Sequence, residues 1–245
     1  DRYASRGLGD VYKRQGAVLL TTSGTAGNVM IDNGTTALGV QGTVSGDLVL
    51  TSVGAVDLGA SAVSGTLGIT SGGTVTSSGK LDITGATTIS ASGQAVSLTN
   101  ADSSFGDFSV TAKDVYIVES GSFSSTSITA ETVQVSATEG VSISSTGDGL
   151  QLAAQSVKGD IEVINTGGLV ISELTSIQGV KLTDVSATGK VSVVAQSPLT
   201  INAPVDAKSG TLTLAAAGNT ATDDIIINST LSGCLLYTSP SPRDA

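Results

Sequence analysis

Several residue types that carry chemistry are missing from most of this chain. None of its 245 residues is histidine or tryptophan, one is cysteine and four are proline. Between residues 16 and 233 there is neither cysteine nor arginine. The lack of cysteine excludes disulfides and thiolate metal sites from this stretch. Without histidine, its many serines also lack the base that most often activates a serine nucleophile.

Positive charge is scarce as well. Residues 16–233 contain six lysines and eighteen acidic residues, which gives a net charge of −12. Nucleic-acid binding needs a basic stripe, so we expect no nucleic-acid partner. There is also no run of eighteen apolar residues, the length that a membrane-spanning helix requires. We therefore expect no membrane insertion of this segment.

The two ends differ in composition from the rest of the chain. One DNA segment, read on its two strands, can encode both SRGLGDVYKRQ (residues 5–15) and CLLYTSPSPR (residues 234–243). That segment resembles a transposase-type sequencing-library adapter. We therefore interpret residues 1–15 and 234–245 as adapter-derived tails. Residues 16–233 are then a repeat domain, and we expect it to be a fragment that continues into further repeats in a longer protein.

Short apolar pairs separated by one small or polar residue recur along residues 16–233. Leu48/Leu50, Val56/Leu58 and Leu67/Ile69 are examples. Each pair places two side chains on the same face of a strand. Glycine or Ser-Gly breaks follow every five to ten residues, and no window has the apolar spacing of a helix. The pattern predicts an all-β fold of short strands.

The pairs repeat at a period of about nineteen residues. The string that starts at Val44 returns at Val63, and equivalent positions are predicted at Leu48, Leu67, Ile89, Phe108, Ile128, Ile143, Ile161, Val180 and Leu199. Repeats of this size indicate a solenoid. We predict a parallel β-helix with three short strands per turn. At a rise of about 4.8 Å, on the order of eleven turns would form a rod roughly 50 Å long.

Several strings resemble the repeat region of filamentous-haemagglutinin-like exoproteins, the large bacterial adhesins exported by two-partner secretion. The strings are GDLVLTSVGAVDL, GTLGITSGGTV, GKLDITGATTI and GVSISSTGDGLQLAA. Autotransporter passenger domains look similar. The resemblance covers nearly all of residues 16–233 and implies a right-handed β-helix, export across the outer membrane and an extracellular or bacterial cell-surface location. The family's secretion domain carries Asn-Pro motifs, which are absent here, as expected for an internal fragment.

The main alternative is a β-helical polysaccharide lyase or glycoside hydrolase fragment. Hydrolases need two or three carboxylates on neighbouring strands. Stacked turns could bring together Asp82, Asp102 and Asp107, or Asp160 and Glu162. We interpret these acids as a solvated face, because aromatic platforms for sugars are missing and the lysines lie in separate turns. The prediction is a protein that is not an enzyme, with no catalytic, cofactor-binding or metal-binding residue and no cofactor.

Two smaller sequence patterns match only part of a known type of binding site. Asp223-Asp224 is the one acidic pair in residues 16–233, and it precedes an apolar run as a turn before a strand would. A calcium site would need more oxygen ligands at loop spacing. An ice-binding face needs Thr-x-Thr in turn after turn, and Thr211-Leu-Thr213 has that form without being repeated.

The sequence thus favours a structural or adhesive segment of a secreted or surface exoprotein, acting as a stiff stalk or a contact surface. The expected partners are surface molecules or glycans of a host or a neighbouring cell. We also expect the bare strand edges of the first and last turns to promote aggregation of the isolated fragment.

Overall fold

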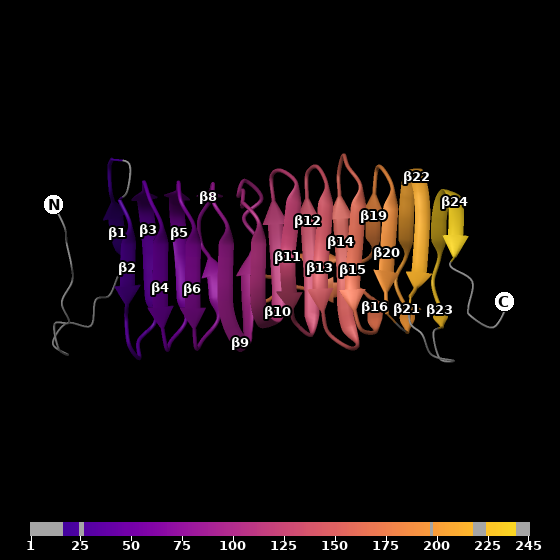
Figure 1. Ribbon diagram of the computed structural model, residues 1–245, viewed down its shortest axis with the longest axis horizontal. Coiled ribbons are helices and arrows are strands. Elements are labelled where there is room, and N and C mark those ends of the chain that lie inside the picture. Colours follow the sequence, from indigo (N-terminus) through magenta and orange to yellow (C-terminus); the bar gives the residue numbers. More distant parts are fainter. Residues whose placement is uncertain (1–16, 25–26, 197, 218–223, 239–245) are drawn as a thin grey trace.

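The computed structural model describes residues 17–24, 27–196, 198–217 and 224–238 (Figure 1). These residues form parallel strands stacked as a β-solenoid along one long axis, and no helix occurs among them. The part of the chain described here accordingly has no helix that could cross a membrane. The predicted fold class, an all-β parallel β-helix, is confirmed.

Each turn of the coil has three sides, which we call A, B and C. Side A contains the strands β2 (Val29–Asp32), β4 (Leu48–Ser52), β6 (Leu67–Ser71), β11 (Phe123–Thr129), β13 (Val141–Thr146), β15 (Ile161–Thr166) and β20 (Val191–Ala195). Side B contains β7 (Val75–Ser77), β16 (Leu169–Ile171), β21 (Leu199–Ile201) and β23 (Ile225–Ile227). Side C contains β8 (Leu81–Ile83) and β19 (Val185–Ala187).

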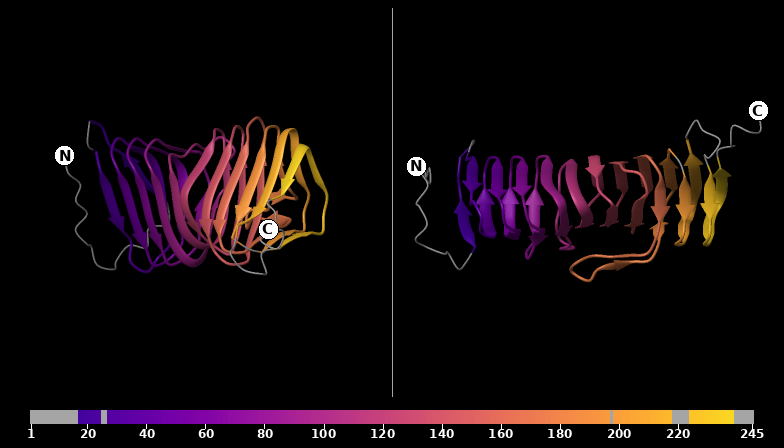
Figure 2. Two further views of the ribbon diagram at one scale, coloured as in Figure 1. Left: turned by 45° about the vertical axis from the view of Figure 1, so that its right-hand side comes forward. Right: turned by 90° about the horizontal axis from the view of Figure 1, so that it is seen from below.

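The remaining strands of the coil run through two or more sides. They are β1 (Val18–Thr21), β3 (Leu38–Val44), β5 (Val56–Val63), β9 (Thr87–Leu98), β10 (Phe108–Glu119), β12 (Thr132–Ala137), β14 (Leu150–Ser156), β22 (Val205–Ala216) and β24 (Leu231–Thr238). A separate antiparallel hairpin of β17 (Leu174–Thr175) and β18 (Lys181–Leu182) lies outside the stack (Figure 2).

Some long strands bend, so that one strand supplies two of the three short segments of a turn. The first part of β5, Val56–Leu58, pairs with β7 on side B, whereas Ser61–Val63 pairs with β8 on side C. One continuous strand therefore supplies two sides of the coil. The register shift between β3 and β5 falls at the same bend.

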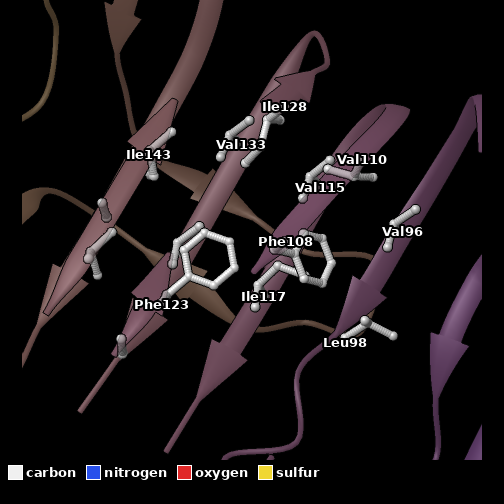
Figure 3. Packing of buried hydrophobic residues seen from close by; sticks show 14 of the residues in the cluster. Val96, Leu98, Phe108, Val110, Val115, Ile117, Phe123, Ile128, Val133 and Ile143 are labelled. Atoms are coloured by element: carbon white, nitrogen blue, oxygen red, sulfur yellow. The ribbon is translucent and has the colours of Figure 1, made fainter. Parts of the chain in front are cut away.

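The core consists of ladders of like residues, one from each turn. On side B, ten residues are in register: Leu38, Val56, Val75, Val96, Val115, Val133, Leu152, Ile171, Ile201 and Ile227. All of them except the last are buried. Figure 3 shows part of this ladder packed against the neighbouring apolar rows. Burying each such side chain contributes about 1.5–3 kcal/mol.

The predicted period holds well in the first turns and drifts later. Leu48 pairs with Leu67 as expected. Thr87 is the true partner of Leu67, so the predicted position Ile89 is two residues late. Because side chains alternate between faces, a shift of two still points a residue into the core.

The predicted steps from Ile161 to Val180 and Leu199 are wrong. Ile161 pairs with Val191, thirty residues later. Leu199 lies on side B, where it pairs with Leu169, and Val180 lies in the hairpin segment outside the coil. The apolar pair Val180/Leu182 has the same spacing as the pairs in the coil strands. Local spacing alone cannot distinguish an inserted hairpin from a turn of the coil.

Of the predicted tails, residues 1–15 lie outside the described residues. At the other end, β24 crosses the predicted boundary after Gly233, and Leu235–Thr238 pair with Thr211–Leu214 of β22. Ladder pairing uses backbone groups, which every residue except proline supplies in full.

A stack of glycines forms the corner between sides C and A. Glycine stands two residues before most side-A segments, at positions 27, 46, 65, 85, 106, 121, 159, 189 and 210. The Gly85 N–H donates to the Gly65 carbonyl oxygen at 3.0 Å. A Cβ atom on Gly85 would lie 2.5 Å from that oxygen. At Gly85, successive turns thus approach too closely for a side chain.

We predict that Gly85→Ala lowers the free energy of unfolding by about 1–3 kcal/mol, because the backbone of two turns must shift to admit the methyl group. Gly68→Ala is the matched control, since its Cβ would meet only Val49 Cγ2, at 3.8 Å. Urea unfolding followed by circular dichroism measures both variants. Equal midpoints for the two alanine variants would contradict the steric account of the corner.

Candidate functional site

The acids that stacked turns could have brought together lie in different environments. Asp82 pairs with the Lys80 ammonium at 2.9 Å and accepts from Ser104 Oγ at 3.3 Å. Asp102 and Asp107 are exposed. Among the described residues, no cluster of three or more Asp, Glu, His or Cys side chains is positioned to hold a metal ion.

Asp160 and Glu162 have different environments although they are close in sequence. Asp160 Oδ1 accepts from the Lys190 N–H of the next turn at 2.7 Å. Glu162 faces solvent on β15, between Ser142 and Ser192 of the flanking turns. The first carboxylate therefore caps a backbone group of the coil, and the second remains free for solvent.

The capping seen at Asp160 recurs at the same corner near the start of the rod. Asn28 Oδ1 accepts from the Asp47 N–H at 2.8 Å, and Asp47 Oδ1 accepts from the Thr66 N–H at 2.7 Å. The Thr66 N–H and hydroxyl lower the pKa of Asp47 below its ordinary value. These side chains occupy the space that the corner glycines leave open, because a Cβ on Gly65 would lie 2.4 Å from Asp47 Oδ1.

The predicted acidic pair Asp223-Asp224 is described only in part, because Asp223 lies outside the described residues. The backbone carbonyl of Asp224 accepts from the Leu199 N–H at 3.0 Å. Asp224 is therefore the residue that precedes β23, as the turn interpretation predicted.

The outer surface of side A carries an extended array of hydroxyl groups. Seven consecutive turns place a hydroxyl residue at the same outward position: Thr51, Thr70, Ser90, Thr111, Thr129, Thr146 and Thr166. Four of these turns carry a second hydroxyl residue two positions earlier: Thr88, Ser109, Ser127 and Ser144. We call these eleven residues the hydroxyl face.

The spacing of the hydroxyl face follows from strand geometry. Neighbouring turns are about 4.8 Å apart, and residues i and i+2 of one strand are about 6.6 Å apart. The Oγ1 atoms of Thr129 and Thr146 lie 2.9 Å from each other, within hydrogen-bond distance. The result is a two-dimensional array of groups that both donate and accept hydrogen bonds.

Sequence reasoning missed this array. Strict Thr-x-Thr is still not repeated, but the broader form, with serine or threonine at both positions, occurs in four consecutive turns between residues 88 and 146. Thr213, by contrast, stacks on Ser192 and then on Glu162, so its ladder contains a charge. A search for serine or threonine at i and i+2, with a period allowed to vary by a few residues, would have identified the hydroxyl face.

A surface groove of 440 Å³ borders the hydroxyl face at the corner between sides A and B. Its lining consists of Ala112, Thr129, Ala130, Glu131, Thr146, Gly147, Asp148, Gly149 and Gln151. Asp148 Oδ1 accepts from the Gly168 N–H at 3.0 Å. The groove thus offers two carboxylates, one amide and two hydroxyls from the array.

Glu119 is an ionisable group that the sequence analysis did not single out. It occupies an inward position of side C whose equivalents in later turns are Ala137, Ser156 and Ala187. The residue is 3% exposed, with Oε1 accepting from the Phe105 N–H at 3.1 Å and Oε2 buried without a partner in the described structure. Burial raises the pKa of Glu119 to about 7, and the Phe105 N–H partly offsets that rise.

The alternation Val115, Ile117, Glu119 could have revealed this carboxyl group, since the third residue falls on the inward face of the same strand. Phe105 also packs edge-on against Phe108, whose ring centroid lies 5.6 Å away, and Phe108 contacts Phe123 in turn. The carboxyl group therefore lies at an apolar part of the core.

The chain was compared with known protein families, curated proteins and solved structures. A family described as repeats of unknown function (DUF5649) matches residues 45–112, which run from β4 into the first part of β10. No curated protein matches the chain significantly. No solved structure does so either.

The raised pKa of Glu119 predicts a pH-dependent stability. The folded state binds the proton more tightly than the unfolded state, whose carboxyl titrates near 4.5. The free energy of unfolding should therefore fall as pH rises from about 4.5 to about 7 and then level off. Glu119→Gln should remove this fall and be more stable than the parent above about pH 7.

Urea unfolding at several pH values tests this, with Glu162→Gln on the exposed surface of β15 as the control. The control should keep the pH dependence of the parent chain. A Glu119→Gln variant with the same pH profile as the parent would show that this carboxyl is not the group responsible.

Proposed function

We propose that this chain is a structural and adhesive segment of a large bacterial secreted or cell-surface exoprotein, in which it acts as a stiff spacer with a contact face. The observation that carries the proposal is the uninterrupted side-B ladder over ten turns, combined with one exposed, uncharged hydroxyl face. The resemblance to filamentous-haemagglutinin-like repeats supports the extracellular, cell-surface location. The match to a repeat family agrees with the repetitive architecture.

Stiffness follows from the way in which the turns are joined. Each turn donates and accepts backbone hydrogen bonds along three sides. The buried apolar residues from Leu38 to Leu214 form one continuous core cluster. Bending such a rod would open hydrogen bonds and apolar contacts on one side at every turn. A segment of this kind keeps its two ends at a fixed separation.

The contact face that we propose is the hydroxyl face together with the adjoining groove. Hydroxyl groups of a neutral glycan can pair with serine and threonine hydroxyls in either direction. Glu131, Asp148 and Gln151 of the groove add acceptors and one amide donor at the edge of the array. The partner class is therefore a neutral, hydroxyl-rich polysaccharide on a host or neighbouring cell.

An enzymatic role, as a polysaccharide lyase or glycoside hydrolase, is the alternative that we do not favour. Asp47, Asp148 and Asp160 each accept from a backbone N–H of the next turn, and Asp82 pairs with Lys80. Removing Asp47, Asp148 or Asp160 would leave a backbone donor of the coil without its partner. Their placement is accounted for by the fold and does not require catalysis.

Binding to ice is a second candidate, and the in-register ladder of seven outward hydroxyl residues is the observation that favours it. Oxygen atoms on a crystal face of ice also repeat in two dimensions. A rigid array with repeats of about 4.8 and 6.6 Å could order water in the same way. Glycan binding and ice binding are separable, because only the second changes the growth of ice crystals.

We predict that Thr111→Lys combined with Thr129→Lys weakens binding by at least about tenfold, since two long charged side chains would interrupt the array and 1.4 kcal/mol corresponds to a factor of ten. Retention on immobilised neutral polysaccharides measures glycan binding, and inhibition of ice recrystallisation measures the second candidate. Thr200→Lys, on side B, is the control.

Unchanged activity of the double variant in whichever assay the parent is positive would rule out the hydroxyl face as the contact surface. A parent chain that is inactive in both assays, but releases reducing or unsaturated ends from an acidic polysaccharide, would favour the enzymatic alternative.

A further inference from the structure

The hairpin β17–β18 is an insertion into a single turn of the coil. In β14, one residue, Ala153, separates the position that pairs with Ile171 from the position that pairs with Val185. In the next turn, thirteen residues, 172–184, fill the same interval. Figure 2 shows this segment leaving the stack and running back beside it towards the earlier turns.

The tip of the hairpin is bonded to turns that lie far away in sequence. The Gln178 side-chain oxygen accepts from Ser97 Oγ at 2.8 Å and from the Thr99 hydroxyl, and its Nε2 donates to the Ser77 carbonyl oxygen at 3.2 Å. The side-B ladder places Ser77 five turns before Ile171. A single glutamine thus joins two turns near the first third of the rod to a segment that starts in its last third.

The body of the hairpin is attached at intermediate turns. Gln134 Nε2 of β12 donates to the Val180 carbonyl oxygen at 3.1 Å. Leu174 and Leu182 form a small buried apolar cluster with Ala153 of β14. An ion pair between Glu173 and Lys181, at 2.6 Å, joins the two arms of the hairpin.

On side B, the outward residues beneath the hairpin are buried, whereas the outward residues of the earlier turns are partly exposed. One outward ladder contains Asp57, Thr76, Ser97, Tyr116, Gln134 and Ala153 in consecutive turns. The last four are buried although they point away from the core of the coil, whereas Asp57 and Thr76 are partly exposed. The face under the hairpin is therefore a second packed layer made of uncharged residues.

We infer that this hairpin is a strap that couples non-adjacent turns and makes the rod from β7 to β16 open as one unit. In a simple solenoid each turn contacts only its neighbours, so local opening can start at any turn and spread from there. Opening of β7 or β9 here also breaks the bonds to Gln178. Under load on the proposed stalk, the strap would keep the middle of the segment from separating turn by turn. This device does not depend on the proposed glycan contact, because the hydroxyl face lies on side A.

Amide hydrogen exchange of the full chain tests the strap. Gln178→Ala should speed exchange in β7 and in Ala95–Leu98 of β9 by roughly tenfold or more, since three hydrogen bonds are lost, while β20 and β22 keep their rates. Gln41→Ala, an exposed glutamine on β3, is the matched control and should change neither region.

A second variant replaces residues 172–184 with one alanine, which shortens the turn from Ile161 to Val191 from thirty to eighteen residues. We expect β7–β9 and β14–β16 to lose protection at different denaturant concentrations in this variant and together in the parent. Unchanged exchange in β7 and β9 in Gln178→Ala, or an equal change along the whole rod, would overturn the inference. If the shortened chain does not fold, the amide exchange rates of Gln178→Ala test the inference by themselves.

Discussion

The constant spacing between hydrogen-bonded turns is the constraint on which the whole structure depends. Parallel backbone pairing holds each strand about 4.8 Å from the strand of the next turn, so every residue stacks on its equivalents. A position that is apolar and inward in one turn must be filled compatibly in the next. The side-B ladder from Leu38 to Ile201 meets this demand with valine, leucine and isoleucine only. The coil therefore needs no large core and no cross-links to become rigid.

The same spacing determines which backbone groups the polar side chains can reach with hydrogen bonds. At the corners, where backbone groups turn away from the ladders, Asp47 and Asp160 cap the next turn and glycine makes room for them. Inside another corner, Asn165 Nδ2 donates to the carbonyl oxygens of Gly147, Gly167 and Gly168. Buried polar side chains thus complete the hydrogen bonding of the coil. Glu119 Oε2 is an exception, as are single side-chain oxygens of Ser77, Thr87 and Gln134, because these atoms are buried without a partner in the described structure.

The three sides of the coil have different surfaces. Side A presents hydroxyl groups to solvent in a regular array, and side B is covered in its middle turns by the inserted hairpin. An insertion is tolerated at this point because the interval between Ile171 and Val185 lies at the outside of the coil, so the ladders continue above and below it. The face that is left open is the one suited to contact with a partner. The covered face adds packing to the rod.

The sequence alone determined the fold class, the approximate period and the three segments per turn, because apolar pairs, glycine breaks and a repeat near nineteen residues are all local signals. It also indicated that Asp224 precedes a strand. The tertiary structure decided which residues stack. Registers such as Leu67 on Thr87 and Ile161 on Val191 depend on corner lengths that vary from turn to turn, and the hairpin's partners are up to 101 residues away. The hydroxyl face and the strap emerge from that stacking, because their residues become neighbours only once the chain is coiled.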